Sequence, residues 1–295
     1  MSLSHARPRI ERLLSKAQGR FGVAAKDLAN GDTILIDAAE LFPLASVFKI
    51  PVLVELYRQA DRGLLQLDRR LEFTGDDRMP GSGVLRTLQP GFALTLRDYA
   101  MLMIIVSDNS ATDKVMAAIG RHSITPTLRE LGLDRTSVSR TCGQILATLA
   151  GYEVEAPTQE QVEAILIALR EGRRASTGWA YDETDRNNVG TPAEMIQLLE
   201  LIHNGEAASE GACREMLGIL RSQQLKQRLP LWLPADVVTA HKTGTLPGVV
   251  NDAGLIYVRP EAACAVAVFS KDGADRNHGS QTIAQIGLAV YEALA

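Results

Sequence analysis

Strand-like segments occur only near the two ends of this 295-residue chain. The segment 21–39, "FGVAAKDLANGDTILIDAA", is typical of two strands joined around Asn30 and Gly31, because Asn-Gly favours a hairpin turn. Strands are next expected in "VVTAHKTG", "NDAGLIYVRP" and "ACAVAVFSKD", which lie between residues 237 and 272. Antiparallel strands that follow one another usually pair, so both ends of the chain should build one sheet.

The segments between these strands have helical apolar spacing from residue 46 to about residue 201. Helices are also expected over 8–18 and at the C-terminal end. We therefore predict an α/β (α+β) fold, in which an antiparallel sheet is flanked by helices and carries an inserted all-helical subdomain. The polar stretch 170–188 is expected to be a long loop.

This organisation predicts one domain over 1–295. An α/β subdomain would consist of 1–45 and 192–295, and the helical subdomain would span 46–191. No repeat or linker-like run divides the chain.

The composition excludes several classes of partner. A net charge of -4 argues against nucleic acid, which normally requires a basic face. No apolar run approaches the roughly 20 residues of a membrane span. The three cysteines and five histidines have no metal-ligand spacing, so we expect no metal and no cofactor. We expect a monomer that is cytoplasmic, or periplasmic or secreted if a signal has been removed.

One apolar stretch holds a hydroxyl beside an ammonium. In "PLASVFKIPVL" (43–53), Ser46 precedes Lys49 by three residues, so on a helix the two side chains share a face. Burial lowers a lysine pKa, and a neutral lysine can take the proton of an attacking serine. The alternative is that Lys49 only packs its stem and extends its head to water. Alone, Ser-x-x-Lys is expected about once by chance in such a length.

Two further motifs favour the catalytic interpretation. Ser107, Asp108 and Asn109 follow an apolar helix, and Lys242, Thr243 and Gly244 end a predicted strand. Finding both tripeptides in order has odds of roughly one in a thousand. Taken singly, Ser107 and Asn109 could cap the next helix, and Lys242 could be a surface charge at a strand end.

With these motifs the chain resembles the superfamily of class A β-lactamases and penicillin-binding serine hydrolases. The resemblance covers nearly the whole sequence, through "SVFK", "MPGSGVL", "SDNSATD", "LRELGLDRTSVSR", "TPAEM" and "HKTGT". It implies that Ser46 is the acylated nucleophile and that Lys49 is the base or part of a base relay. Ser107 would pass a proton to the leaving nitrogen. Asn109 would hold Lys49 and the substrate amide.

The resemblance also implies a substrate-binding strand. Lys242 and Thr243 would bind the substrate carboxylate, and the strand after Gly244 would pair with the acyl side chain. Gly244 would let the backbone approach the ligand closely. The backbone N–H groups of Ser46 and Thr245 would form an oxyanion hole.

The sequence departs from the class A pattern after Arg140. Class A β-lactamases have a Glu-Pro-x-Leu-Asn loop there, whose Glu activates the water that breaks the acyl-enzyme. Here Cys142 occupies the Glu position and Leu146 the Asn position. A thiol and an isobutyl group cannot hold that water as a carboxylate and an amide do. Carboxylates farther along the chain are candidates for a replacement base: Glu171, Asp182, Glu183 and Asp185.

Three functions remain open at this point. The first is a serine hydrolase that β-lactams acylate and that hydrolyses them, with slow deacylation and a role in antibiotic resistance. The second is a D-alanyl-D-alanine carboxypeptidase, amidase or esterase that acts on a peptidoglycan-type acyl donor. The third is a non-catalytic penicillin-binding module, which would have no need to keep every motif residue.

Overall fold

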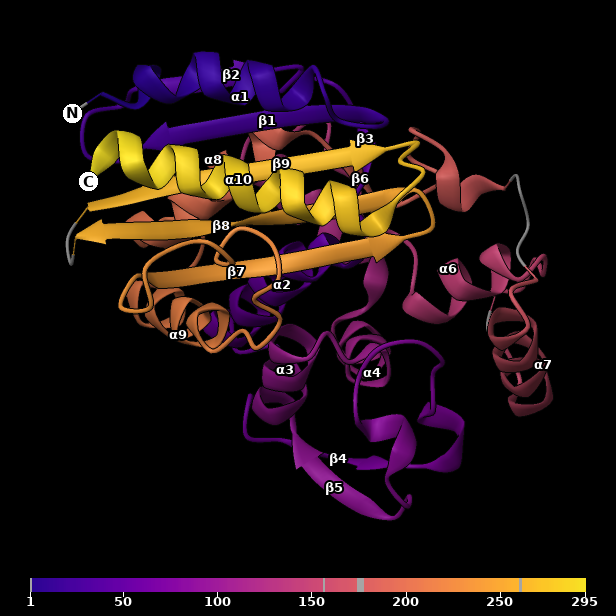
Figure 1. The fold of residues 1–295 in the computed structure, drawn as a ribbon. Helices are drawn as coiled ribbons and strands as arrows, with labels where there is room; N and C mark the ends of the chain where they lie inside the picture. Colours follow the sequence, from indigo (N-terminus) through magenta and orange to yellow (C-terminus); the bar gives the residue numbers. More distant parts are fainter. Residues whose placement is uncertain (1, 156, 174–177, 260–261) are drawn as a thin grey trace.

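A five-stranded antiparallel sheet joins the two ends of the chain (Figure 1). The computed structural model describes every residue except 1, 156, 174–177 and 260–261. The strand order is β2-β1-β9-β8-β7. The strands are β1 (Arg20–Asp27), β2 (Thr33–Ile36), β7 (Val238–Leu246), β8 (Val249–Arg259) and β9 (Ala262–Lys271). The predicted mixed fold is therefore confirmed, and β1 and β2 form the predicted hairpin.

Both faces of the sheet are covered by helices. On one face, α1 (Arg7–Leu14) and α10 (Arg276–Leu294) run along the strands, as Figure 1 shows. On the other face lie α8 (Pro192–Asn204) and α9 (Glu210–Arg221). Within β9, Val266 and Val268 enter the core under α1 and α10, whereas Ala267 and Phe269 enter the core on the α8 side. Burial on both faces explains why β9 is an unbroken apolar run rather than an alternating one.

The segment inserted between β2 and α8 is mainly helical. Its helices are α2 (Lys49–Asp61), α3 (Leu96–Ile105), α4 (Asn109–Ile119), α5 (Ile124–Glu130), α6 (Cys142–Leu149) and α7 (Gln159–Arg170). Short 3₁₀ turns join several of these helices, and η2 (Ala45–Phe48) leads directly into α2. A 3₁₀ turn, η6 (Trp179–Tyr181), interrupts the predicted long loop before α8.

The insertion is not all-helical, and the prediction is corrected here. β4 (Arg70–Phe73) pairs with β5 (Phe92–Thr95), and β3 (Phe42–Pro43) pairs with β6 (Val189–Gly190). Strands of two to four residues are too short to show a period of two in the sequence. Among the described residues, no helix is long and apolar enough to cross a membrane.

Candidate active site

Ser46 and Lys49 lie where η2 becomes α2, on the insertion side of the sheet. Ser46 is partly exposed to a cavity, whereas Lys49 has no exposed surface. The residue before the serine, Ala45, has a φ of +45°, a left-handed conformation that non-glycine residues rarely adopt. Backbone strain of this kind persists only where the surroundings impose it. The geometry excludes the surface interpretation of Lys49, because its head does not reach bulk water.

Three oxygen atoms surround the Lys49 ammonium. Lys49 Nζ lies 2.9 Å from the carbonyl oxygen of Ser107, 2.9 Å from Asn109 Oδ1 and 3.2 Å from Ser107 Oγ. The carbonyl and amide oxygens can accept two protons of a neutral amine. The lone pair of the neutral amine is then left free, near the Ser107 hydroxyl.

Lys242 reaches the same hydroxyl from β7. Its Nζ donates to Ser107 Oγ at 3.0 Å and to the carbonyl of Thr243 at 2.7 Å, and its side chain is fully buried. Ser107 therefore lies between two lysines, with a strained φ of +56°. This burial excludes a surface charge at the strand end for Lys242.

Burial dominates the ionisation of both lysines. It lowers the pKa of Lys49 below its ordinary 10.5 and lowers that of Lys242 well below the same value. Nearby Lys49 further lowers the Lys242 pKa. No described carboxylate forms an ion pair with either ammonium. Nearby carboxylates offset burial only in part, through Asp113 and Asp108 for Lys49 and through Asp252 for Lys242, so the pKa of each lysine stays lowered.

The loop around Ser107 is held by Asp108 and Asn109. Asp108 caps α4 through Ala111 N, and its carboxylate also accepts the N–H groups of Val84 and Leu85. The predicted alternative, a cap by Ser107 or Asn109, is wrong, because Asp108 fills that role. Asn109 donates from Nδ2 to the carbonyl of Pro80 at 2.8 Å while its oxygen holds Lys49.

Gly244 also has a packing role that the sequence did not indicate. A Cβ atom built on Gly244 would lie 2.6 Å from the Leu44 carbonyl oxygen and 3.1 Å from the Ala45 side chain. The missing side chain therefore lets β7 lie close to the backbone before Ser46. Asn251 on β8 fastens the same segment, donating to the carbonyls of Pro43 and Leu44.

A buried arginine, missed in the sequence analysis, supports Thr245. Arg228 Nη1 donates to the carbonyls of Gly244 and Asn251 at 2.6 Å, and Nη2 donates to Thr245 Oγ1 at 2.5 Å. Desolvation lowers the Arg228 pKa to about 10. A hydroxyl that accepts from Arg228 keeps its own proton to donate, so Thr245 can donate into the cavity. The loop segment "QLKQRLP" gave no periodic or motif signal for this arginine.

Cys142 begins α6 and is almost fully buried, with 4% of its surface exposed. Its thiol pKa rises to about 12 through desolvation, so the thiol stays protonated. Behind it, Asp113 accepts the N–H groups of Cys142 and Gly143 at 2.7 and 2.8 Å. Desolvation also raises the pKa of Asp113, to about 6. Together with Leu146, which lines the cavity, Cys142 makes the α6 side of the cavity uncharged.

The acidic residues proposed as a replacement base lie elsewhere. Glu171 pairs with Arg173, Asp182 with Arg186, and Glu183 with Arg20 and Lys271. Asp185 is exposed. None of the four is among the described residues that line the cavity. Their sequence distance from Arg140 gave no information on their direction in space.

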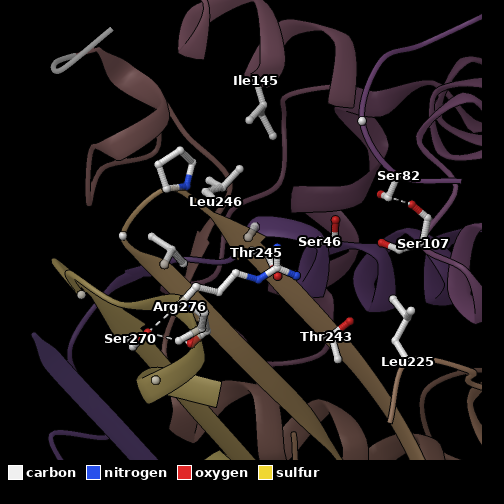
Figure 2. Close-up of a pocket in the computed structure, with 18 of the residues that line it drawn as sticks. Ser46, Ser82, Ser107, Ile145, Leu225, Thr243, Thr245, Leu246, Ser270 and Arg276 are labelled. Carbon is white, nitrogen blue, oxygen red and sulfur yellow. Dashed lines mark hydrogen bonds between the residues drawn. The ribbon is translucent and has the colours of Figure 1, made fainter. Parts of the chain in front are cut away.

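The cavity has a volume of about 710 Å³ and lies between β7, α6 and the start of α10. Figure 2 shows that Ser46, Ser107, Thr243 and Thr245 face one common space. Asn109, Cys142 and Leu146 also line it. The structure thus gathers the predicted residues of all three motifs around one cavity.

Comparisons with known proteins agree with this arrangement. A family model described as "Beta-lactamase enzyme family" matches residues 5–294. A beta-lactamase of Bacteroides uniformis is 25% identical over 306 residues, covering 99% of this chain and 92% of that protein. The crystal structure of a beta-lactamase from Sphaerobacter thermophilus is 27% identical, with a TM-score of 0.80 and coverage of 99% and 98% of the two chains.

A third similar structure is a mutant of PBP-A, in which a glutamate replaces a leucine, in an acyl-enzyme complex with penicillin G. It is 25% identical, with a TM-score of 0.79, and the match covers 99% of this chain and 97% of that one. The family match extends over nearly the whole chain and includes every motif residue in the cavity. This chain belongs to the beta-lactamase enzyme family and is a hydrolase of the class A type.

Proposed function

We propose that this hydrolase uses Ser46 as a nucleophile, forms an acyl-enzyme with β-lactams and releases it slowly. The proposal rests on a difference between two sides of the cavity: one has groups that can activate a serine, and the other lacks a base for water. Lys49 is hydrogen-bonded to Ser107 and Asn109 at the cavity that Ser46 and Ser107 line, whereas Cys142 and Leu146 line the α6 side without a carboxylate.

Acylation requires a base for the Ser46 hydroxyl and a proton donor for the leaving nitrogen. Neutral Lys49 accepts the Ser46 hydroxyl proton as Ser46 Oγ bonds to the β-lactam carbonyl carbon. The backbone N–H groups of Ser46 and Thr245 would stabilise the oxyanion. When the C–N bond breaks, Ser107 donates its proton to the leaving nitrogen and recovers one from the Lys49 ammonium. Lys49 thereby returns to its neutral form.

Substrate binding uses the groups on β7. Thr243 and Thr245 offer hydroxyl donors to the substrate carboxylate, and Lys242 supplies the positive charge. Because Lys242 has no acidic partner among the described residues, binding the carboxylate compensates a charge that burial leaves unpaired.

Deacylation requires a base for water, and the α6 side has only a protonated thiol there. Asp113 is turned away from this role, because both of its oxygens accept backbone N–H groups of α6. The mutant of PBP-A was captured as an acyl-enzyme with penicillin G. That precedent supports the formation of a penicillin acyl-enzyme here.

The lack of a base for water on the α6 side also favours a second function, in which β-lactams are not the natural substrates. A D-alanyl-D-alanine carboxypeptidase, amidase or esterase would form the same acyl-enzyme with a peptidoglycan-type acyl donor, and penicillin would then be an inhibitor. A non-catalytic module is disfavoured, because a binder has no use for a desolvated Lys49 held by Asn109 and Ser107.

Intact-mass spectrometry with benzylpenicillin tests the proposal. We expect wild-type protein to gain the mass of one penicillin on a peptide containing Ser46, and the adduct to persist for minutes to hours. Ser46→Ala should gain none, whereas a control at an exposed serine, Ser15→Ala, should label like wild type. An adduct on the Ser46→Ala variant would contradict the nucleophile assignment.

The time course separates the two functions. An adduct that clears with release of penicilloate identifies a β-lactamase. An adduct that persists, in a protein that hydrolyses a D-alanyl-D-alanine peptide or an ester, identifies the second function.

A further inference from the structure

A second serine hydroxyl contacts the carbonyl that holds Lys49. Ser82 Oγ donates to the carbonyl oxygen of Ser107 at 2.7 Å, and Lys49 Nζ lies 2.9 Å from the same oxygen. Ser82 lines the catalytic cavity, and Figure 2 shows it next to Ser107, with the hydrogen bond between them. Neither the sequence motifs nor the acylation steps use this hydroxyl.

The loop around Ser82 is packed so closely that its position is imposed. Ser82 lies between two glycines with left-handed φ, +92° at Gly81 and +111° at Gly83. A Cβ atom at Gly81 would lie 2.6 Å from Asn109 Nδ2, and one at Gly83 would lie 2.3 Å from the Asp108 carboxylate. The backbone N–H of Asn109 also donates to the Ser82 carbonyl, at 3.0 Å. The loop therefore comes close enough for the Ser82 hydrogen bond only because both neighbours lack side chains.

The Ser82 hydroxyl fills the second acceptor position on a strained residue. A carbonyl oxygen accepts two hydrogen bonds, and Lys49 and Ser82 are the two described side chains that donate to that of Ser107. Ser107 has a φ of +56°, and such a conformation persists only where its surroundings impose it. Lys49 has a further acceptor in Asn109 Oδ1, at 2.9 Å, so its position does not depend on this carbonyl alone. Loss of the Ser82 donor should therefore affect Ser107 more than Lys49.

We infer that Ser82 is a positioning residue for Ser107. Its hydroxyl holds the Ser107 carbonyl, and this keeps Ser107 Oγ where it can give its proton to the leaving nitrogen. Ser82 touches no reacting atom in this role. The inference rests on the proposed serine hydrolase function, and it adds a residue on which the proton transfer of that function depends.

Two acyl donors with different leaving groups test the inference. Benzylpenicillin has a leaving nitrogen that needs a proton, whereas N-benzoylglycyl mercaptoacetate releases a thiolate that leaves without one. We expect Ser82→Ala to lower the rate of Ser46 acylation by benzylpenicillin about three- to tenfold, the range for one hydrogen bond, and to change acylation by the thioester less than about twofold. Intact mass gives the rate for penicillin, and the initial burst of released mercaptoacetate gives the rate for the thioester.

Two variants serve as controls. Ser82→Thr keeps a hydroxyl and should recover most of the rate that Ser82→Ala loses with benzylpenicillin. Ser222→Ala removes an exposed hydroxyl that donates to the Gly218 carbonyl at 2.9 Å, outside the cavity, and should be acylated like wild type by both donors.

Equal losses for the two donors in Ser82→Ala would overturn the inference, because Ser82 would then act on the base or on the fold. No loss for either donor would overturn it as well. A Ser82→Thr variant as slow as Ser82→Ala would also overturn it, since the hydroxyl would then not be the group that matters.

A structural measurement keeps the inference separate from the chemistry. If wild type is acylated by neither donor, the proposed function fails, and crystal structures of wild type and Ser82→Ala then test the inference. We expect the φ of Ser107 to leave the left-handed region, and its Oγ to move, in the variant alone. An unchanged Ser107 in Ser82→Ala would overturn the inference.

Discussion

The β7 side of the cavity and the α6 side differ in charge and in chemistry. Lys49 and Lys242 meet at Ser107 on the β7 side, where each ammonium is held by two or more oxygen atoms. On the α6 side, Cys142 and Leu146 offer a protonated thiol and an alkyl group. The first side has the groups for making an ester on serine, and the second lacks a group for hydrolysing it.

The two sides also differ in how they are supported. The Ser46 segment is tied to the sheet through Gly244 and Asn251, so its geometry depends on the main core. At the start of α6, two backbone N–H groups donate to Asp113 of α4, which is the one described carboxylate that accepts them. Substitutions on the α6 side can therefore change deacylation while leaving acylation intact.

Removing the base should have the largest effect. Lys49→Ala should lower the rate of adduct formation with benzylpenicillin by about 10²- to 10⁴-fold, the usual contribution of a general base. Stopped reactions followed by intact mass would give the rate, and Lys226→Ala, at an exposed lysine, is the control. If Lys49→Ala labelled at the wild-type rate with its fold intact, Lys49 would not be the base.

Placing a carboxylate on the α6 side should show whether the lack of a base there makes deacylation slow. Cys142→Glu combined with Leu146→Asn should speed loss of the penicillin adduct by about 10- to 100-fold, part of what a well-placed base supplies. The measurement is the decay of the adduct after removal of free penicillin. Cys142→Gln with Leu146→Asn has the same shape without the charge and should show no gain. An equal gain in both double variants would show that the carboxylate is not acting as a base.

The sequence predicted the β7 side well because its residues belong to short contiguous motifs. A motif such as Ser107-Asp108-Asn109 includes its own helix cap, so the local geometry follows from the residues themselves. The antiparallel sheet was also predictable, since β7, β8 and β9 are long enough to show their apolar pattern. Family resemblance then indicated which motifs meet.

What the sequence missed depends on contacts between distant residues. Arg228 is a single basic residue in an irregular loop, and only the fold places it beside Gly244 and Asn251. The packing of Gly244 against the backbone of Leu44 was not predicted, because it depends on how β7 lies against the segment before Ser46. The β4–β5 hairpin has four residues per strand, which is too few for a periodic signal.

The pH dependence of acylation tests the β7 side further. Burial lowers the Lys49 pKa, so neutral Lys49 becomes more abundant as pH rises toward that lowered value. Labelling should therefore rise by up to about tenfold per pH unit on the acid side, as for a single titrating base. Loss of the Lys242 charge should lower it again at higher pH, since that pKa is also reduced by burial. The two limbs belong to a coupled pair, because both ammoniums contact Ser107 Oγ.

The variant Lys242→Arg separates these limbs. Arginine stays protonated at every pH in the measurement, so the fall at higher pH should move up or disappear while the acid limb remains. A profile that keeps both limbs unchanged in this variant would assign the basic limb to a group other than Lys242.

The smallest effect is expected at the thiol itself. Cys142→Ala should leave the rate of penicillin labelling within about twofold of wild type, because a buried thiol with a pKa of about 12 is neither a base nor a nucleophile at neutral pH. Asp113 still accepts the backbone N–H groups of residues 142 and 143 in this variant and loses only its contact with the thiol. Labelling rates and the alkylation rate with iodoacetamide at about pH 8 provide the measurement, and slow alkylation of wild type is expected. A labelling rate lowered by about tenfold would instead show that the thiol takes part in acylation. The α6 side would then contribute to both steps of the reaction.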